Sequence, residues 1–235
     1  GQGHALSPTG INYRANIDVL KRCGVTDLVS VSACGSLKEE FAPGTFVLVD
    51  QFIDRTFARE KSFFGDGCVA HVSMAYPVSP KLVDCVEKAA RAEDLLYRRG
   101  GTYLAMEGPQ FSSLAESHLY RSWGCDVIGM TNMPEAKLAR EAELPYATIA
   151  MVTDYDCWFD EVEAVSVSNV LEVMRQNTER AKQAIVELAS SLNGAERSPS
   201  PQGIETCLDF AMITAPEARD PEILARLDAI AGRVL

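Results

Sequence analysis

Short apolar runs that alternate with helical segments are the feature that most restricts the fold of this 235-residue chain. Five such runs are rich in β-branched residues, carry few charges and are too short for ordinary helices, so each predicts a buried strand. They are 28–33 (LVSVSA), 45–50 (TFVLVD), 102–106 (TYLAM), 126–130 (DVIGM) and 146–152 (YATIAMV). The alternation predicts an α/β fold with a central mixed sheet flanked by helices.

Helical spacing and capping residues indicate where the helices lie. The expected helices cover 11–22, 81–93, 134–142 and 166–192, and a further helix begins at 113. Ser113 and Glu116 form an S-x-x-E capping box, and Ser166 is a suitable N-cap for the long helix. Strands and helices therefore alternate along most of the chain.

The composition changes after Leu192. The stretch NGAERSPSPQG is typical of a linker, and a short apolar segment (207–213) and a terminal helix follow it. We therefore expect one domain over 1–192, then a linker and C-terminal tail over 193–235. The tail is expected to pack on the domain or on a neighbouring subunit.

The composition also excludes several classes of function. A net charge of −11 and a pI near 4.8 argue against nucleic acids and anionic membranes as partners, because both require clustered Lys and Arg. A small-molecule ligand is the better expectation. No apolar run reaches the roughly 20 residues that span a bilayer, and no signal peptide opens the printed sequence, so we expect a cytoplasmic protein.

The cysteines and histidines do not form a metal-binding pattern. The seven cysteines are dispersed without CxxC spacing, and the three histidines are far apart in the sequence. Free, mostly buried thiols and no metal ion are the expectation.

Small or polar residues follow the ends of several apolar runs, where ligands bind in open α/β sheets. The stretches are Ser32–Gly35, Glu107–Phe111, Met130–Thr131 and Thr153–Asp156. A chain that simply turns explains any one of them, whereas all four together favour a ligand site. The backbone of 32–36 could cradle an anion or could form a tight turn that needs Gly35, and both interpretations stay open. Met130, Phe111 and Thr131 could likewise serve packing and β propensity alone.

Asp154 and Asp156 are the strongest single signal, because a buried apolar run leads into them and Cys157-Trp158 follows. Side chains at i and i+2 share one face if the strand continues. Two carboxyl groups held close together and partly buried have pKa values that are pushed apart, so one can stay protonated near neutral pH. The pair could then donate a hydrogen bond at one point and accept one at another.

Five longer motifs resemble a known family when they are read together. They are NYRANI (12–17), ACGSLKEE (33–40), DQFIDRT (50–56), EGPQFSS (107–113) and TDYDCW (153–158). They resemble the methylthioadenosine phosphorylases, in the trimeric branch of the purine nucleoside phosphorylase family. The resemblance is dense over residues 1–192 and weak in the tail.

The resemblance implies a purine nucleoside phosphorylase-like fold and a phosphorolysis reaction. Phosphate would displace adenine from S-methyl-5′-thioadenosine to give 5-methylthioribose 1-phosphate, a step of methionine and purine salvage. The family uses no metal or organic cofactor, since phosphate is a co-substrate, and it forms homotrimers with active sites at subunit borders. The resemblance also implies that a glycine-rich phosphate loop and an Arg-His pair precede the printed sequence, which therefore carries only part of the anion site.

The resemblance also assigns residues to parts of the substrate, with Asp154 as the catalytic residue. The residues carried over are Ser32, Ala33 and Thr131 for phosphate, Met130 for the sugar, Phe111, Ser112, Thr153, Asp154 and Asp156 for the purine, Tyr155 for the substrate beside them, and Val167, Val170, Ile213 and a neighbouring subunit's His71 for the 5′-methylthio group.

The chemistry of the leaving group agrees with this assignment. Adenine gains negative charge as the glycosidic bond breaks, so a protonated Asp154 that donates to N7 stabilises the transition state more than the ground state. Asp156 would accept from the 6-amino group, and a carboxylate there disfavours 6-oxopurines. Val167 and Val170 suit a methylthio group because an apolar wall leaves a 5′-hydroxyl unpaired.

Three other functions remain as alternatives. A phosphorylase of 6-oxopurine nucleosides or methylthioinosine is disfavoured by the acid pair, and a hydrolytic nucleosidase by the phosphate-facing Ser32 and Thr131. A noncatalytic nucleoside-binding module would follow if the N-terminal phosphate segment were missing from the protein itself.

Overall fold

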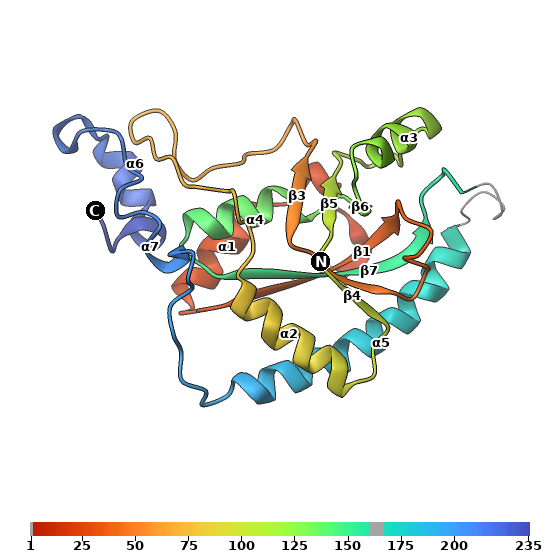
Figure 1. The fold of residues 1–235 in the computed structure, drawn as a ribbon. Helices are drawn as coiled ribbons and strands as arrows, with labels where there is room; N and C mark the ends of the chain where they lie inside the picture. Colours follow the sequence, from red (N-terminus) through yellow and green to blue (C-terminus); the bar gives the residue numbers. More distant parts are fainter. Residues whose placement is uncertain (1, 160–166) are drawn as a thin grey trace.

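The computed structural model describes residues 2–159 and 167–235 and contains a seven-stranded sheet with helices on both faces (Figure 1). The strands are β1 (Leu28–Ser36), β2 (Phe46–Leu48), β3 (Gln51–Asp54), β4 (Tyr97–Arg99), β5 (Thr102–Ala105), β6 (Val127–Gly129) and β7 (Tyr146–Tyr155). The helices are α1 (Tyr13–Arg22), α2 (Pro80–Ala92), α3 (Leu114–Ser122), α4 (Asn132–Glu141), α5 (Val167–Leu192), α6 (Pro221–Arg226) and α7 (Asp228–Ala231).

The sheet is mixed, as the sequence predicts. Its strand order is β3-β5-β6-β1-β7-β2-β4. β1 and β7 run parallel along their whole lengths, from the pair Leu28–Tyr146 to the pair Ser36–Tyr155. β6 runs antiparallel to β1, and β2 runs antiparallel to β7. The two longest strands therefore form the centre of the sheet.

The strand predictions are right at the centre of the sheet and incomplete at its edges. β3 and β4 were not predicted, because their sequences QFID and YRR carry charges and lack an apolar run. β4 is an edge strand with two exposed arginines, a common protection against edge-to-edge pairing. Conversely, β1 continues through Cys34-Gly35-Ser36, where a turn was one of the two interpretations.

The helix predictions are correct to within a few residues. The capping box at Ser113 is present, with its hydroxyl accepting from the Glu116 backbone N–H. α4 begins at Asn132, two residues earlier than expected, although Met133 has extended backbone angles. The predicted N-cap Ser166 lies outside the described residues. α2 and α5 pack together on one face of the sheet, whereas α1 and α4 pack together on the other (Figure 1).

The C-terminal tail packs against the domain of its own chain. The middle of the tail pairs with the loop before α2, through a bridge between Ala70 and Met212. At its end, Leu227 and Ile230 are almost fully buried, and Arg233 forms an ion pair with the buried Glu143. Figure 1 shows this blue segment beside α1 and α4.

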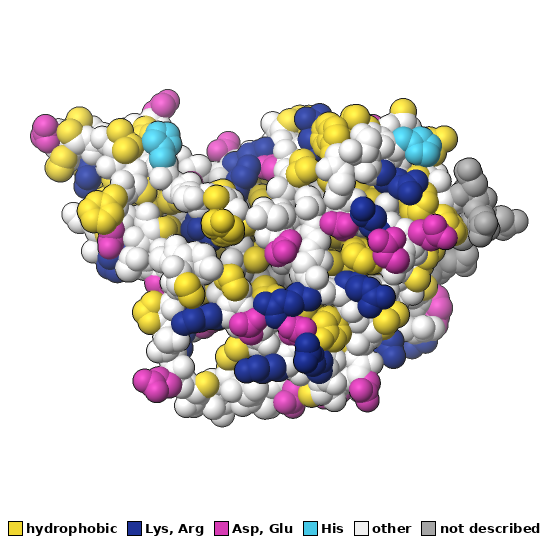
Figure 2. Space-filling view, in the orientation of Figure 1, with side chains coloured by type: hydrophobic (Ala, Val, Ile, Leu, Met, Phe, Trp, Pro, Cys, Tyr) yellow, Lys and Arg dark blue, Asp and Glu magenta, His cyan; other side chains and the backbone are white. Residues whose placement is uncertain are grey.

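The surface carries both signs of charge. On the face shown in Figure 2, basic and acidic side chains lie among one another. Some of the surface charges are paired, as Arg99 is with Asp84 and Arg91 with Glu87. Among the described helices, none combines the length and the hydropathy that crossing a bilayer requires.

Candidate functional site

Ser32 and Thr131 meet between β1 and the start of α4. Their hydroxyl oxygens lie 3.2 Å apart, although 98 residues separate them in sequence. Ser32 is inside β1, and Thr131 is the N-cap residue of α4, separated from the end of β6 only by Met130. Only the last two residues of β1, Gly35 and Ser36, pair with β6. At Ser32 this edge of β1 therefore does not pair with β6, and it faces Thr131 instead.

This position corrects one part of the sequence interpretation. Ser32 and Ala33 lie in the middle of a long strand and not beyond its carboxyl end. The register shifts between Cys34 and Gly35, because these neighbours pair with Val152 and Asp154 and leave Thr153 of β7 as the extra residue of a β-bulge. A hydroxyl and a strand edge, instead of a loop, thus form the proposed phosphate end of the site.

The two acids share one face because β7 continues as far as Tyr155. The Asp156 backbone N–H then donates to the Ser36 carbonyl oxygen at 3.1 Å, which extends the pairing with β1. A Cβ atom on Gly35 would lie 3.0 Å from Asp154 Oδ1 and 3.5 Å from Asp156 Cβ. Both acids therefore lie over Gly35, and a larger residue there would push the carboxyl of Asp154 aside.

Burial alters the protonation of both acids. Loss of hydration raises the pKa of Asp154, and the neighbouring charge of Asp156 raises it further, while the Thr153 hydroxyl, 2.7 Å from Asp154 Oδ2, opposes the shift. Burial also raises the pKa of Asp156. Asp156 Oδ2 is buried and has no hydrogen-bond partner among the described residues. A buried acceptor without a partner is costly, so this atom is suited to a ligand N–H group.

The loop that follows β5 lies next to the acids. The Cys157 thiol donates to the Ser112 carbonyl oxygen at 3.4 Å, which places Ser112 beside the end of β7. Phe111 is 72% exposed, so packing in the core, which was the alternative interpretation of this residue, is excluded. Gly108 lies against Met130, because a Cβ there would be 2.5 Å from the Met130 sulfur. The loop thus connects the acid pair with Met130.

The residues expected around a 5′-substituent are placed less completely. His71 is exposed, and its backbone N–H donates to Ala211 in the tail at 2.9 Å. Ile213 is 64% exposed on the same tail segment. Val167 and Val170 lie at the start of α5, and their side chains are outside the described residues.

A buried ion pair behind the site was missed by the sequence analysis. The Arg59 side chain is fully buried and lies 3.2 Å from Glu107 Oε1. Burial alone would raise the pKa of Glu107, but hydrogen bonds from Thr9, from the backbone of Phe57 and Ala58 and from Arg59 lower it to about 2. Glu107 follows a predicted strand and was a visible candidate, whereas Arg59 lies in a stretch without periodicity.

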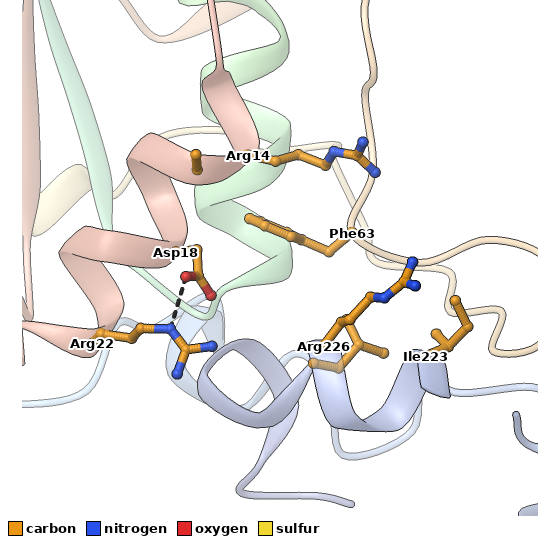
Figure 3. Close-up of a pocket in the computed structure, with 8 residues that line it drawn as sticks. Arg14, Asp18, Arg22, Phe63, Ile223 and Arg226 are labelled. Atoms are coloured by element: carbon orange, nitrogen blue, oxygen red, sulfur yellow. Dashed lines mark hydrogen bonds and ion pairs between the residues drawn. The ribbon is translucent and has the colours of Figure 1, made fainter. Parts of the chain in front are cut away.

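A separate cavity of about 420 Å³ lies between α1 and the tail helix α6. Figure 3 shows Arg14 and Arg226 on its rim, with Phe63 between them. It shares no lining residue with the cluster around Asp154 and Ser32. The acid pair, rather than this cavity, is the candidate active site.

The raised pKa of Asp154 predicts how activity should depend on pH. Burial favours the neutral acid, so the proton persists to higher pH than on a free aspartate and is lost as the pH rises further. The rate of base release should therefore fall on the alkaline side. The check is to compare pH profiles of kcat/KM for the wild type and Asp154→Asn. Ionisation of phosphate affects both proteins equally, so identical alkaline limbs would contradict the role of this proton.

The comparisons with known proteins agree on one family. A model of the phosphorylase superfamily matches residues 2–190. A protein of Bradyrhizobium diazoefficiens named S-methyl-5′-thioadenosine phosphorylase is 63% identical over 234 residues, which cover 100% of this chain and 80% of that protein. A protein of the same name from Geobacter sulfurreducens is 48% identical over 99% of this chain and 80% of its own length.

Solved structures show the same likeness in three dimensions. A methylthioadenosine phosphorylase from an antarctic soil metagenomic library has a TM-score of 0.91 and 47% identity, covering 98% of this chain and 80% of that chain. A methylthioadenosine phosphorylase of Schistosoma mansoni in complex with adenine has a TM-score of 0.84 and 35% identity, covering 91% of this chain and 82% of that chain. The fold expected from the motifs is thereby confirmed.

Proposed function

The chain belongs to the phosphorylase superfamily, and from this premise we propose that it catalyses the phosphorolysis of S-methyl-5′-thioadenosine to adenine and 5-methylthioribose 1-phosphate. The relatives named S-methyl-5′-thioadenosine phosphorylase, at up to 63% identity, support this reaction. The observation that carries the choice of base is the pair Asp154 and Asp156 over Gly35, with an unpartnered oxygen on Asp156. Phosphate is the co-substrate, and no cofactor takes part in the proposed reaction.

The proposed roles follow the direction in which charge moves. Asp154, as the neutral acid, donates to adenine N7 while negative charge develops on the leaving base. Asp156 accepts from the 6-amino group through Oδ2, which satisfies that buried atom. Ser32, Ala33 and Thr131 bind the attacking phosphate on the other side of the sugar, which packs on Met130. The bond to N9 breaks as a phosphate oxygen forms the new bond to C1′.

The remaining parts of the site contribute shape. The exposed ring of Phe111 is available to stack on the purine, with Ser112 and Thr153 near the acids. The Tyr155 ring stacks on Phe159 and its hydroxyl donates to the Glu39 carbonyl oxygen, so Tyr155 would support the acids from the opposite face and not contact the purine. We also propose that the protein is a homotrimer, because His71 and Ile213 are exposed and are suited to complete a neighbour's 5′-methylthio pocket together with Val167 and Val170. The 1–192 domain and the 193–235 tail would then belong to the same assembly.

Seven free cysteines support a reducing, cytoplasmic location. The products of the proposed reaction suit purine and methionine salvage.

The test of the reaction is its dependence on phosphate. The full-length protein is incubated with methylthioadenosine, with and without inorganic phosphate, and free adenine is measured. We expect adenine only when phosphate is present, because the attacking oxygen belongs to phosphate. Equal release without phosphate would identify a hydrolase, and no release in either case would identify a nucleoside-binding protein; both results would overturn the proposal.

A further inference from the structure

Tyr103 is a buried residue that connects the two hydroxyl groups of the proposed phosphate site. It lies in the middle of β5 with none of its surface exposed, and its ring packs against Phe52 with centroids 5.8 Å apart. Its phenolic oxygen lies 3.4 Å from Ser32 Oγ. The backbone of Thr131 lies close enough to this oxygen to lower the pKa of the phenol against the larger, opposite effect of its burial. β5 thus places the Tyr103 hydroxyl next to Ser32 and Thr131, which are distant from each other in sequence.

Gly129 makes room for this phenol. A Cβ atom built on Gly129 would lie 1.9 Å from the Tyr103 hydroxyl oxygen and 2.7 Å from the ring carbon that carries it. Gly129 pairs with Ala105 across β5 and β6, so Tyr103 reaches it diagonally on the same face of the sheet. Any side chain on residue 129 would displace the phenol. The glycine and the tyrosine therefore form one structural unit.

The hydrogen bonds around Tyr103 have a defined direction. Burial raises the pKa of its phenol, so the hydroxyl keeps its proton at every working pH. Ser32 Oγ donates to the Ala33 carbonyl oxygen, so Oγ is free to accept the proton of the Tyr103 hydroxyl 3.4 Å away. Ser32 Oγ lies 3.2 Å from the Ala33 carbonyl oxygen, and its proton can turn from there towards an incoming anion. A hydroxyl that accepts at its oxygen is a better donor at its hydrogen.

We propose that Tyr103 is a positioning residue for phosphate, which acts by holding Ser32 as a hydrogen-bond donor and Thr131 in place, in the space that Gly129 leaves open. This inference rests on the proposed phosphorolysis, in which Ser32 and Thr131 bind the co-substrate. It adds a determinant of phosphate affinity that does not itself touch the substrate. Tyr103 lies on β5, whereas the acid pair lies at the end of β7, and β6 and β1 separate the two strands. We therefore expect its effect to be confined to the anion end of the site.

The test is Tyr103→Phe, which removes the hydroxyl and keeps the ring that packs on Phe52. We expect the KM for phosphate to rise about tenfold, since a hydrogen bond that serves a charged group is lost. The KM for methylthioadenosine should change less than twofold. Initial rates over a grid of both substrates give both constants, and a melting curve shows that the variant is folded.

Tyr146→Phe is the matched control. Tyr146 is equally buried in a central strand, but its hydroxyl donates to Glu135 at 2.8 Å instead of facing Ser32. This variant should lose stability and keep the wild-type KM for phosphate. An unchanged phosphate KM in Tyr103→Phe, or equal increases in both variants, would overturn the inference while wild-type phosphorolysis stands. If the wild type itself needs no phosphate, the proposed function fails, and the inference fails with it.

Discussion

Replacing Asp154 with Asn is expected to lower kcat/KM for methylthioadenosine about 100-fold, the usual size of a lost general acid. The amide still donates to N7, but it cannot transfer a proton to the leaving adenine. Methylthioinosine should lose much less, because the amide has two N–H donors and can bond to N7 and to the neighbouring 6-oxygen of that base. The measurement is the initial rate of base release from both nucleosides at saturating phosphate.

The control for this variant is Asp50→Asn. Asp50 also accepts a backbone hydrogen bond at a strand end, from Gly101 at 3.1 Å, but it precedes β3 and is not part of the site. Its activity should match the wild type on both nucleosides. Equal losses on the two nucleosides in Asp154→Asn would mean that the residue supports the fold and does not recognise the base.

Replacing Arg59 with Met is expected to cost about 3–5 kcal/mol in free energy of unfolding, the range seen when one partner of a buried ion pair is removed. The Arg59 guanidinium donates to the Met130 and Met133 carbonyl oxygens and to the Glu107 carbonyl oxygen, in addition to its ion pair. All of these acceptors would lose their donor, and the charge of Glu107 would remain buried. Urea denaturation at one fixed protein concentration gives the change.

Two further variants show whether the ion pair is the cause. Adding Glu107→Gln to Arg59→Met removes the stranded charge and should restore part of the stability. Arg22→Met removes an arginine whose ion pairs with Asp18 and Asp228 lie on the surface, so its effect should be far smaller. A loss as large as that of Arg59→Met would show that burial is not decisive.

The centre of the fold could be predicted because it depends on local patterns. The run 146–152 is almost continuously apolar, and the structure buries it on both faces as the first seven residues of β7. The strands β3 and β4 could not be predicted, because pairing with a neighbour, rather than their own composition, makes QFID and YRR strands. The bulge at Thr153 of β7 was also hidden, because the sequence of β7 is apolar up to Val152 almost without a break, and Gly35 on β1 allows a turn until the approach of Asp154 is known.

The site divides in the same way. The i, i+2 spacing of Asp154 and Asp156 already predicts a shared face, because that geometry needs only a continuing strand. The contacts of Tyr103 and Arg59 could not be read from the chain, because each joins segments that are far apart in sequence. Tyr103 resembles any aromatic residue in a buried strand. Its hydroxyl has room to lie near Ser32 only because Gly129 has no side chain, and the sequence does not show that these residues meet.

The parallel pairing of β1 with β7 has a consequence for the dynamics of base recognition. Paired strands at the centre of a sheet usually open only with the whole domain, so their amides exchange with solvent at the rate of global unfolding. Asp154 is part of such a strand, whereas Phe111 lies on an exposed loop. The carboxyl proposed to recognise the base is therefore fixed before any substrate arrives, and adjustment to the ligand is left to the loop that carries Phe111.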